Sequence, residues 1–485
     1  MGLIGLTRWP LAPTRHLYHI DNVNFALALA DFDPRLDQPQ PPGDPVYVAL
    51  TRAMHRLIPR VEILFPLSGI LGSAAAAVAM WWLGEMLFGR RAGVLAFLLL
   101  TFNPIFWLAG IGNYVRVYLA LGATVVAGLV WKSLDGSAVY FCASAAALGF
   151  FAGFRPEMGL LLAPLIVFPA WRRRAPLSDW LAAGCFAAAT ALPWLLITAQ
   201  HSGGIAALYR LNRDYLAMQS RHTSWLYGAS LAEAARMAVA SIYWNLLGAV
   251  PWIAFVPFAW KRLHFDRAAK FLTLWFVPPF FFYTFVHIHN PDHALTAIPA
   301  VCLAGAWVLT RLPAGWLRYA APASLTLTIV LFFYPTRSPF WASNYRIAQH
   351  TIRSAEQIYS RLDQLEKSGP VTVLSRHGYI TPREIGYYYP DLPMLDFGSE
   401  PALIQLRNPL QTRSGELLIR AGWVLWIDPV APPEPACFDG LRAVVKGGIA
   451  SDGPVHWAKV SPGTRFQVAG QWIRTEDGDA TKAFQ

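Results

Sequence analysis

The sequence has 485 residues, of which 55% are hydrophobic and only 14% are charged, and its mean hydropathy is +0.35. A soluble domain carries about 25% charged residues. The composition therefore excludes a cytosolic globular enzyme, a disordered chain and a fibrous protein, and it indicates a polytopic membrane protein. The net charge of +11 does not indicate a nucleic-acid partner, because most short-loop Lys and Arg residues are explained by membrane orientation.

Residues 1–60 contain no spanning stretch, and we expect them to form the first outward loop. The start, MGLIGLTRWPLAP, is too short and too broken by proline for a signal peptide or a spanning helix. Asp21 precedes the apolar stretch 23–30, a position that suits a helix N-cap. The same carboxylate, held at the membrane surface, is a candidate general base for an acceptor hydroxyl. The two interpretations are compatible, because a cap is also a fixed position.

Ten mainly apolar segments follow, at 63–83, 93–111, 114–131, 139–154, 157–171, 179–199, 239–260, 268–287, 293–310 and 318–335. A spanning helix needs about 20 such residues. The segments 139–154 and 157–171 are short, so they form either two short spans or a broken pair. The sequence thus predicts an all-α polytopic membrane domain over residues 61–335.

Basic residues alternate between the loops that join these spans. One set of loops is rich in them: Arg90, Arg91, Lys132, Arg172, Arg173, Arg174, Lys261, Arg262, Arg267, Arg311 and Arg318. The alternate loops hold little beyond Arg116 and Arg155. By the positive-inside rule the first set is cytoplasmic. We therefore expect a multi-pass protein of the inner membrane with both termini outside.

Residues 336–485 regain charge and show the alternation typical of strands. Segments 371–374, 417–419 and 424–427 are predicted strands, and 382–389 is a predicted short helix. We expect a small extracytoplasmic α/β domain here. Cysteines add no constraint, since three of the four, Cys142, Cys185 and Cys302, lie in apolar runs and indicate neither a disulfide framework nor a metal site.

Arg116 and Arg155 are charged residues at outward helix ends in apolar surroundings. Charges near a bilayer core are costly and often functional. The planar guanidinium binds two phosphate oxygens at once, which makes both residues candidate phosphate ligands. The alternative is that they snorkel to the interface, and Glu157 can simply pair with Arg155.

The outward turn HIHNPDH contains His287, His289, Asp292 and His293. Imidazole and carboxylate groups are metal ligands. This spacing matches no compact zinc motif, so we favour solvated or substrate-facing histidines and assign no metal and no cofactor. The sequence also has no phosphate-binding glycine loop, no dinucleotide fingerprint and no nucleophile elbow, so nucleotide-driven chemistry is unsupported.

Taken together, these features resemble the GT-C superfamily of integral-membrane glycosyltransferases, closest to the bacterial branch related to protein O-mannosyltransferases and aminoarabinose transferases. The resemblance rests on HIDNVNFALAL, QPQPPGDPVYV, LFGRRAG, GNYVRVYLAL and GFRPEMGLLLAPL, and it covers residues 16–170, with the later spans alike in topology only. It implies sugar transfer on the outer face from a polyprenyl-phosphate donor to an acceptor hydroxyl of a lipid, glycan or protein, with inversion of the anomeric carbon.

The acidic catalytic residue of the family's first outward loop corresponds to Asp21. The family motif HPPGYP reads QPPGDP here, so Gln40 replaces the histidine and Asp44 the tyrosine, and Asn113 stands where an acidic residue is common. We assign substrate binding to Gln40, Asp44, Asn113, His289 and His293, and donor-phosphate binding to Arg116 and Arg155. The family usually has one more transmembrane helix before the Asp21 loop, and its absence here leads us to expect a truncated start.

Two other interpretations remain open. A lipid or polysaccharide transporter or flippase would show inverted repeats and paired broken helices near the membrane midplane, and the sequence shows neither. A catalytically inactive scaffold of the same fold is suggested by the departures at Gln40 and Asn113.

Overall fold

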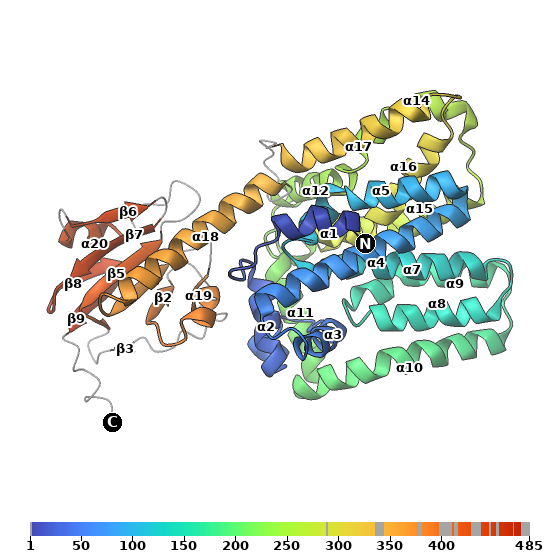
Figure 1. Ribbon diagram of the computed structural model, residues 1–485. Coiled ribbons are helices and arrows are strands. Elements are labelled where there is room, and N and C mark those ends of the chain that lie inside the picture. Colours follow the sequence, from blue (N-terminus) through green and yellow to red (C-terminus); the bar gives the residue numbers. More distant parts are fainter. Residues whose placement is uncertain are drawn as a thin grey trace. The chain divides into compact units, whose positions relative to one another are not determined.

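The structure is a computed structural model that describes residues 2–287, 290–334, 344–375, 381–396, 410–411, 416–427, 438–445, 448–452, 455–468 and 470–476. The chain divides into two compact units (Figure 1). The helical unit comprises Met1–Arg15 and Asn24–Ala348, and the C-terminal unit comprises His16–Val23 and Gln349–Gln485. The short segment that contains Asp21 thus belongs to the C-terminal unit, although most of the helical unit separates the two parts in sequence.

The helical unit is built from helices throughout. Their bounds are α1 Gly2–Arg8, α2 Ile20–Ala30, α3 Pro45–His55, α4 Val61–Phe88, α5 Arg90–Thr101, α6 Pro104–Ala109, α7 Val117–Ser133, α8 Ala138–Phe151, α9 Glu157–Arg172, α10 Leu177–His201, α11 Ile205–Ser220, α12 Leu231–Leu246, α13 Val250–Ile253, α14 Val256–Ala259, α15 Arg267–Phe281, α16 Ile298–Thr310 and α17 Leu317–Phe333. Helix α2 begins in the C-terminal unit and continues into this one.

Four helices in the described part of the chain are long and apolar enough to cross a membrane: Val61–Phe88, Tyr114–Ser133, Leu177–His201 and Arg267–Val286. Several other apolar helices are shorter. Helix α10 exposes large apolar side chains along its length, such as Leu181 at 62% and Phe186 at 54%. A surface of this kind is unfavourable in water and is suited to lipid. The predicted all-α membrane domain is therefore confirmed as a fold class.

The predicted spans fall on helices, but not all of them are one continuous α-helix. The segment 93–111 consists of α5 and α6, and the segment 239–260 is interrupted after α12 and resumes as the single turns α13 and α14. Pro104, Pro251 and Pro257 stand at the starts of the resumed helices. Proline has no N–H to continue a preceding helix, whereas it fits the first turn of a new one.

Glycines let the long apolar helix α4 pack closely against the shorter helix α5. A Cβ added to Gly84 of α4 would lie 2.9 Å from the Cα of Gly93 in α5. Small residues allow such backbone approach, which replaces the hydrophobic driving force that lipid does not supply.

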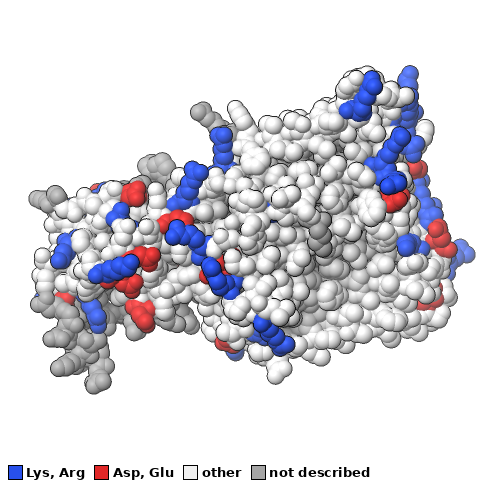
Figure 2. All heavy atoms as spheres, viewed as in Figure 1, with Lys and Arg blue, Asp and Glu red and all other residues white. Residues whose placement is uncertain are grey.

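The basic loops of the helical unit meet at one end of it. Arg267 at the start of α15 pairs with Asp135 after α7 at 2.9 Å, and the Arg262 guanidinium donates to the carbonyl of Arg311 after α16 at 3.4 Å. The Lys132 ammonium lies over the Trp82 ring. Figure 2 shows Lys and Arg side chains gathered at the right-hand end of this unit and a broad uncharged surface beside them.

The C-terminal unit contains two sheets. Its helices are α18 Tyr345–Glu366, which begins in the helical unit, α19 Pro382–Tyr388 and α20 Asp439–Val444, and its strands are β1 Val371–Ser375, β2 Met394–Asp396, β3 Leu410–Gln411, β4 Leu417–Arg420, β5 Gly422–Ile427, β6 Ala450–Asp452, β7 Val455–Val460, β8 Arg465–Val468 and β9 Gln471–Glu476. The sheet orders are β2-β1-β5-β7-β6 and β3-β4-β9-β8. Strand β1 is parallel to β2 and β5, with Val373 opposite Met394 and Leu425, while β5 and β7 are antiparallel. The predicted α/β domain is confirmed as a fold.

Strand alternation gives the five-stranded sheet two buried faces. In β5, Leu425 and Ile427 pack under α18, whereas Val424 and Trp426 pack toward the second sheet and α20. Successive side chains of a strand point to opposite faces, so both faces of this sheet are apolar. Helix α18 covers the first face with residues at helical spacing: Ala355, Ile358, Tyr359, Leu362 and Leu365.

Candidate active site

Interrupted helices converge in the helical unit. Asn113 precedes the short turn η3 (Tyr114–Arg116) that opens α7, and Arg155 stands just before α9. Helix α15 ends in the π-helical turn η6 (Phe282–Val286), and η7 (Pro291–Thr296) precedes α16. Non-helical backbone at membrane depth is tolerated only where protein buries it or where it lines a cavity. These interruptions therefore mark the place in this unit where polar side chains are expected to be functional.

Asp292 joins two residues that the sequence places far away from it. The side-chain amide of Asn113 donates to Asp292 Oδ2 at 2.9 Å, and Arg116 Nε lies 3.5 Å from the same oxygen. Asn113 and Arg116 are each only 5% exposed. Asn113 and the donor-phosphate candidate Arg116 thus share the carboxylate of Asp292, whose place in the histidine turn gave no sign of this contact.

Arg155 pairs with Glu157, as its position in the sequence allowed. Arg155 Nε donates to Glu157 Oε1 at 2.9 Å, and the arginine is 7% exposed. Arg155 also interacts electrostatically with Asp44 and Asp292, and Glu157 does so with Arg116. These five residues form one group, the arginine–carboxylate cluster.

The arginine–carboxylate cluster carries three carboxylates against two guanidinium groups, so its formal charge is −1. Burying charges is costly unless they are paired, and here each arginine has a carboxylate within ion-pair distance. Neither arginine simply extends into the interface, since Arg116 and Arg155 are both buried. The snorkelling interpretation of the two arginines therefore does not describe their surroundings.

Aromatic and imidazole side chains line the same region. Tyr283 interacts electrostatically with Arg155, Arg116 and Glu157. The His287 and His293 rings lie 5.3 Å apart, and Tyr283 lies 5.3 Å from His293. His293 is 2% exposed. His289 lies outside the described residues. Among the residues that are described, no three His, Cys, Asp or Glu side chains come close enough together to hold a metal ion.

The proline-rich turn brings Asp44 to the cluster and places Gln40 against α2. Asp44 is 1% exposed and has a left-handed backbone (φ 37°), which Asp tolerates better than most residues. It directly precedes Pro45, and the Val46 N–H at the start of α3 donates to the Gly153 carbonyl at 3.0 Å. The side-chain amide of Asn24 in α2 donates to Gln40 Oε1 at 2.9 Å.

Asp21 belongs to the C-terminal unit. Helix α2 begins at Ile20, so Asp21 is its second residue and the N-cap prediction is wrong. The helix extends further back than the apolar run because the Asn22 and Val23 N–H groups both donate to the His19 carbonyl. An acidic residue in the first turn still interacts favourably with the helix dipole. The Asp21 N–H donates to His19 Nδ1 at 3.2 Å, and Asp21 interacts electrostatically with Glu384.

Two residues that interact with the candidate residues had no recognisable signal of that interaction in the sequence. Tyr283 stands in the apolar run FFFYTFV, where its hydroxyl gave no signal. Glu384 stands two residues after Pro382 in the predicted short helix, where it forms a capping box with Thr381. A Thr followed three residues later by Glu is a readable capping signature, but nothing local connects it with Asp21.

No protein-family model matches the sequence, and no curated protein matches it either. Two solved structures of ArnT from Cupriavidus metallidurans, one bound to undecaprenyl phosphate and one in the apo state, are similar in fold. Each matches with a TM-score of 0.63 and 13% sequence identity, and each match covers 94% of this chain and 96% of the ArnT chain. The chain therefore has the ArnT fold over nearly its whole length, and the fold expected from the GT-C resemblance is confirmed.

Proposed function

We propose that the protein is a membrane glycosyltransferase that moves a sugar from a polyprenyl-phosphate donor to an acceptor hydroxyl on the outer face, with inversion. The arginine–carboxylate cluster carries this proposal. A bundle that served only as a structural anchor has no reason to gather five charged side chains, three of them buried and two half-buried, at interruptions of its helices. The ArnT fold supports the same conclusion, because one of the similar ArnT structures is bound to undecaprenyl phosphate.

The reaction is a single displacement at the anomeric carbon. Asp21 takes the proton of the acceptor hydroxyl, the acceptor oxygen forms a bond to the anomeric carbon, and the bond from that carbon to the phosphate oxygen breaks. The leaving polyprenyl phosphate gains negative charge. Arg116 and Arg155 stabilise that charge as pre-positioned donors in a site with little water.

The charge of the cluster constrains how the donor binds. Asp292 and Glu157 approach the Nε atoms of Arg116 and Arg155. A guanidinium has five N–H donors, so a phosphate can bind beside the carboxylate instead of replacing it. The carboxylates then hold the arginines in place while the donor is absent. Asn113, Asp44, Gln40 and His293 are our proposed substrate-binding residues in this unit. His289, which lies outside the described residues, is proposed for the same role from its place in the sequence alone.

The same proposal assigns an orientation. The end of the helical unit where the basic loops meet faces the cytoplasm, by the positive-inside rule. The protein is then a multi-pass protein of the inner membrane, and the domain after residue 336 is extracytoplasmic, as is the first loop with Asp21.

The test is transfer by the purified protein in detergent, with a polyprenyl-phosphate sugar and detection of released polyprenyl phosphate. Asp21→Asn should abolish transfer, because an amide cannot accept the proton. Its stability should fall by less than about 1 kcal/mol, the usual worth of a charge in the first helical turn. Asp31→Asn is the matched control, since Asp31 is an exposed acid just after the same helix.

Undiminished turnover by Asp21→Asn would contradict the assignment of the base. If the wild-type protein releases no polyprenyl phosphate from any polyprenyl-phosphate sugar, the proposed transferase activity is wrong. Movement of the intact donor between leaflets would then support a flippase.

A further inference from the structure

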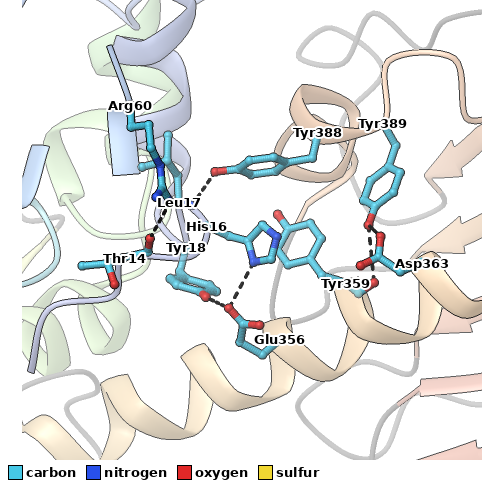
Figure 3. A network of polar contacts seen from close by, with 10 residues as sticks. All are labelled: Thr14, His16, Leu17, Tyr18, Arg60, Glu356, Tyr359, Asp363, Tyr388 and Tyr389. Atoms are coloured by element: carbon cyan, nitrogen blue, oxygen red, sulfur yellow. Dashed lines mark hydrogen bonds and ion pairs between the residues drawn. The ribbon is translucent and has the colours of Figure 1, made fainter. Parts of the chain in front are cut away.

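The segment just before Asp21 is held by the C-terminal unit through consecutive contacts (Figure 3). The His16 ring stacks on Tyr359 with centroids 4.2 Å apart, and its Nδ1 lies 3.0 Å from Glu356 Oε1. The Tyr18 hydroxyl donates to the same carboxylate oxygen. Between them, the Leu17 N–H donates to the Tyr388 hydroxyl at 2.8 Å. Three successive residues are therefore anchored by side chains of this unit.

The anchors come from one face of each of two helices. Glu356 and Tyr359 are three residues apart on α18, and Glu384 and Tyr388 are four apart on α19, so each pair points in one direction. We call Glu356, Tyr359 and Tyr388 the clasp. Figure 3 shows the clasp side chains directed toward His16, Leu17 and Tyr18.

The clasp is rigid because its helices are built into the core. Tyr359 is fully buried and packs in the cluster that α18 forms with the five-stranded sheet. In the same cluster, Ile385 anchors α19. The hydroxyl of Tyr389, at the end of α19, donates to Asp363 of α18 at 2.5 Å and so ties the two helices together. A side chain held by a packed helix positions its partner more sharply than one on a free loop.

The contacts continue to Asp21 itself. Glu384, one turn before Tyr388 on α19, interacts electrostatically with Asp21 and is 3% exposed. His19 contacts the Asp21 backbone N–H. The surroundings of Asp21 in this unit are thus set by the helix that also binds Leu17.

We propose that the clasp positions the catalytic base: Glu356, Tyr359 and Tyr388 fix residues 16–18 and thereby set the direction in which Asp21 presents its carboxylate to the acceptor hydroxyl. This inference rests on the proposed function, because it needs Asp21 to be the base. The clasp residues are positioning residues, since they act through the backbone of the segment.

We expect substitutions in the clasp to change kcat. A base that is misaligned by a small distance slows proton transfer, whereas binding of the lipid donor depends on other groups. Tyr388→Phe removes the hydroxyl that accepts from Leu17 and keeps the ring. Glu356→Gln keeps the shape and weakens the charged contacts to His16 and Tyr18. Each variant should lower kcat about 5- to 10-fold, the equivalent of roughly one hydrogen bond, with little change in donor KM.

The matched control is Glu366→Gln. It makes the same chemical change as Glu356→Gln on the same helix, but Glu366 is exposed and lies outside the clasp. A second readout, hydrogen exchange of the peptide 14–23 in the full-length protein in detergent, reports the anchoring without any substrate. Tyr388→Phe and Glu356→Gln should speed exchange there, and Glu366→Gln should not.

The possible results separate the two proposals. Faster exchange of residues 14–23 in Tyr388→Phe with unchanged kcat would overturn the positioning role while leaving the glycosyltransferase intact. Unchanged exchange would overturn the clasp. A wild-type protein with no transfer activity would overturn the proposed function, and this inference with it, even if the exchange result reproduced the contacts. An equal loss of kcat in Glu366→Gln would show a general effect of the substitution on the domain and would also overturn the positioning role.

Discussion

Glu384 makes the stability of the C-terminal unit depend on pH. Burial raises the pKa of its carboxyl from an ordinary 4.5 to about 7, although the Thr381 N–H donates to it at 2.6 Å. The folded unit therefore binds this proton more tightly than the unfolded chain does. The stability that protonation contributes is fully present below pH 4.5 and is lost as the pH rises through 7. A pKa difference of about 2.5 corresponds to about 3 kcal/mol.

The perturbation is Glu384→Gln. Glutamine keeps the size of the side chain and an oxygen that accepts from Thr381, but it cannot ionise. The protection of β1 and α18 against hydrogen exchange, measured in the full-length protein in detergent and corrected for the intrinsic pH dependence, should fall in the wild type between pH 5 and pH 8. In Glu384→Gln that part of the fall should vanish.

Glu366→Gln is the control, because Glu366 lies at the exposed end of α18. It should keep the wild-type dependence on pH. If Glu384→Gln and the wild type lose protection in parallel as the pH rises, burial does not hold the proton on Glu384 and the reasoning is refuted.

The remaining predictions concern the donor site, the packing and the orientation. Arg116→Lys and Arg155→Lys should each weaken donor use by about 1–3 kcal/mol in donor titrations at fixed acceptor, because lysine lacks the two-pronged contact, and alanine should do worse; unchanged donor dependence in an alanine variant would remove that arginine from the phosphate site. Gly153→Ala should lower the free energy of unfolding by about 1–3 kcal/mol, because the added Cβ would lie 2.3 Å from Val46, and the thermal midpoint in detergent should fall accordingly. Gly184→Ala has open space around the added Cβ and should leave the midpoint unchanged. A cysteine in place of the exposed Ser451 should react with an impermeant thiol reagent in intact cells, and labelling only after lysis would reverse the orientation.

The sequence by itself determined the features that depend on local pattern. Apolar runs of spanning length predicted helices because every backbone N–H and C=O in lipid must be satisfied within the segment. Short, mainly apolar runs at 371–374 and 424–427 predicted β1 and β5, because a strand that is buried on both faces is apolar along its whole length. The alternation of loops rich and poor in Lys and Arg predicted which loops lie at the same end of the helical unit. The contact of Arg267 with Asp135 joins two of the basic loops.

Only the tertiary structure decided which polar groups meet. Arg116 and Asp292 are far apart in sequence, and their pairing depends on how α7 and η7 pack, which no local pattern records. The pairing of Arg155 with Glu157 was readable because the two are neighbours. The segment 16–23, like the pair Arg116 and Asp292, depends on contacts that are distant in sequence. Its residues indicate a helix start, but it belongs to the C-terminal unit because it contacts Glu356 and Tyr388, far along the chain. Such contacts form through the packing of whole elements, so a single sequence specifies them only by way of the complete fold.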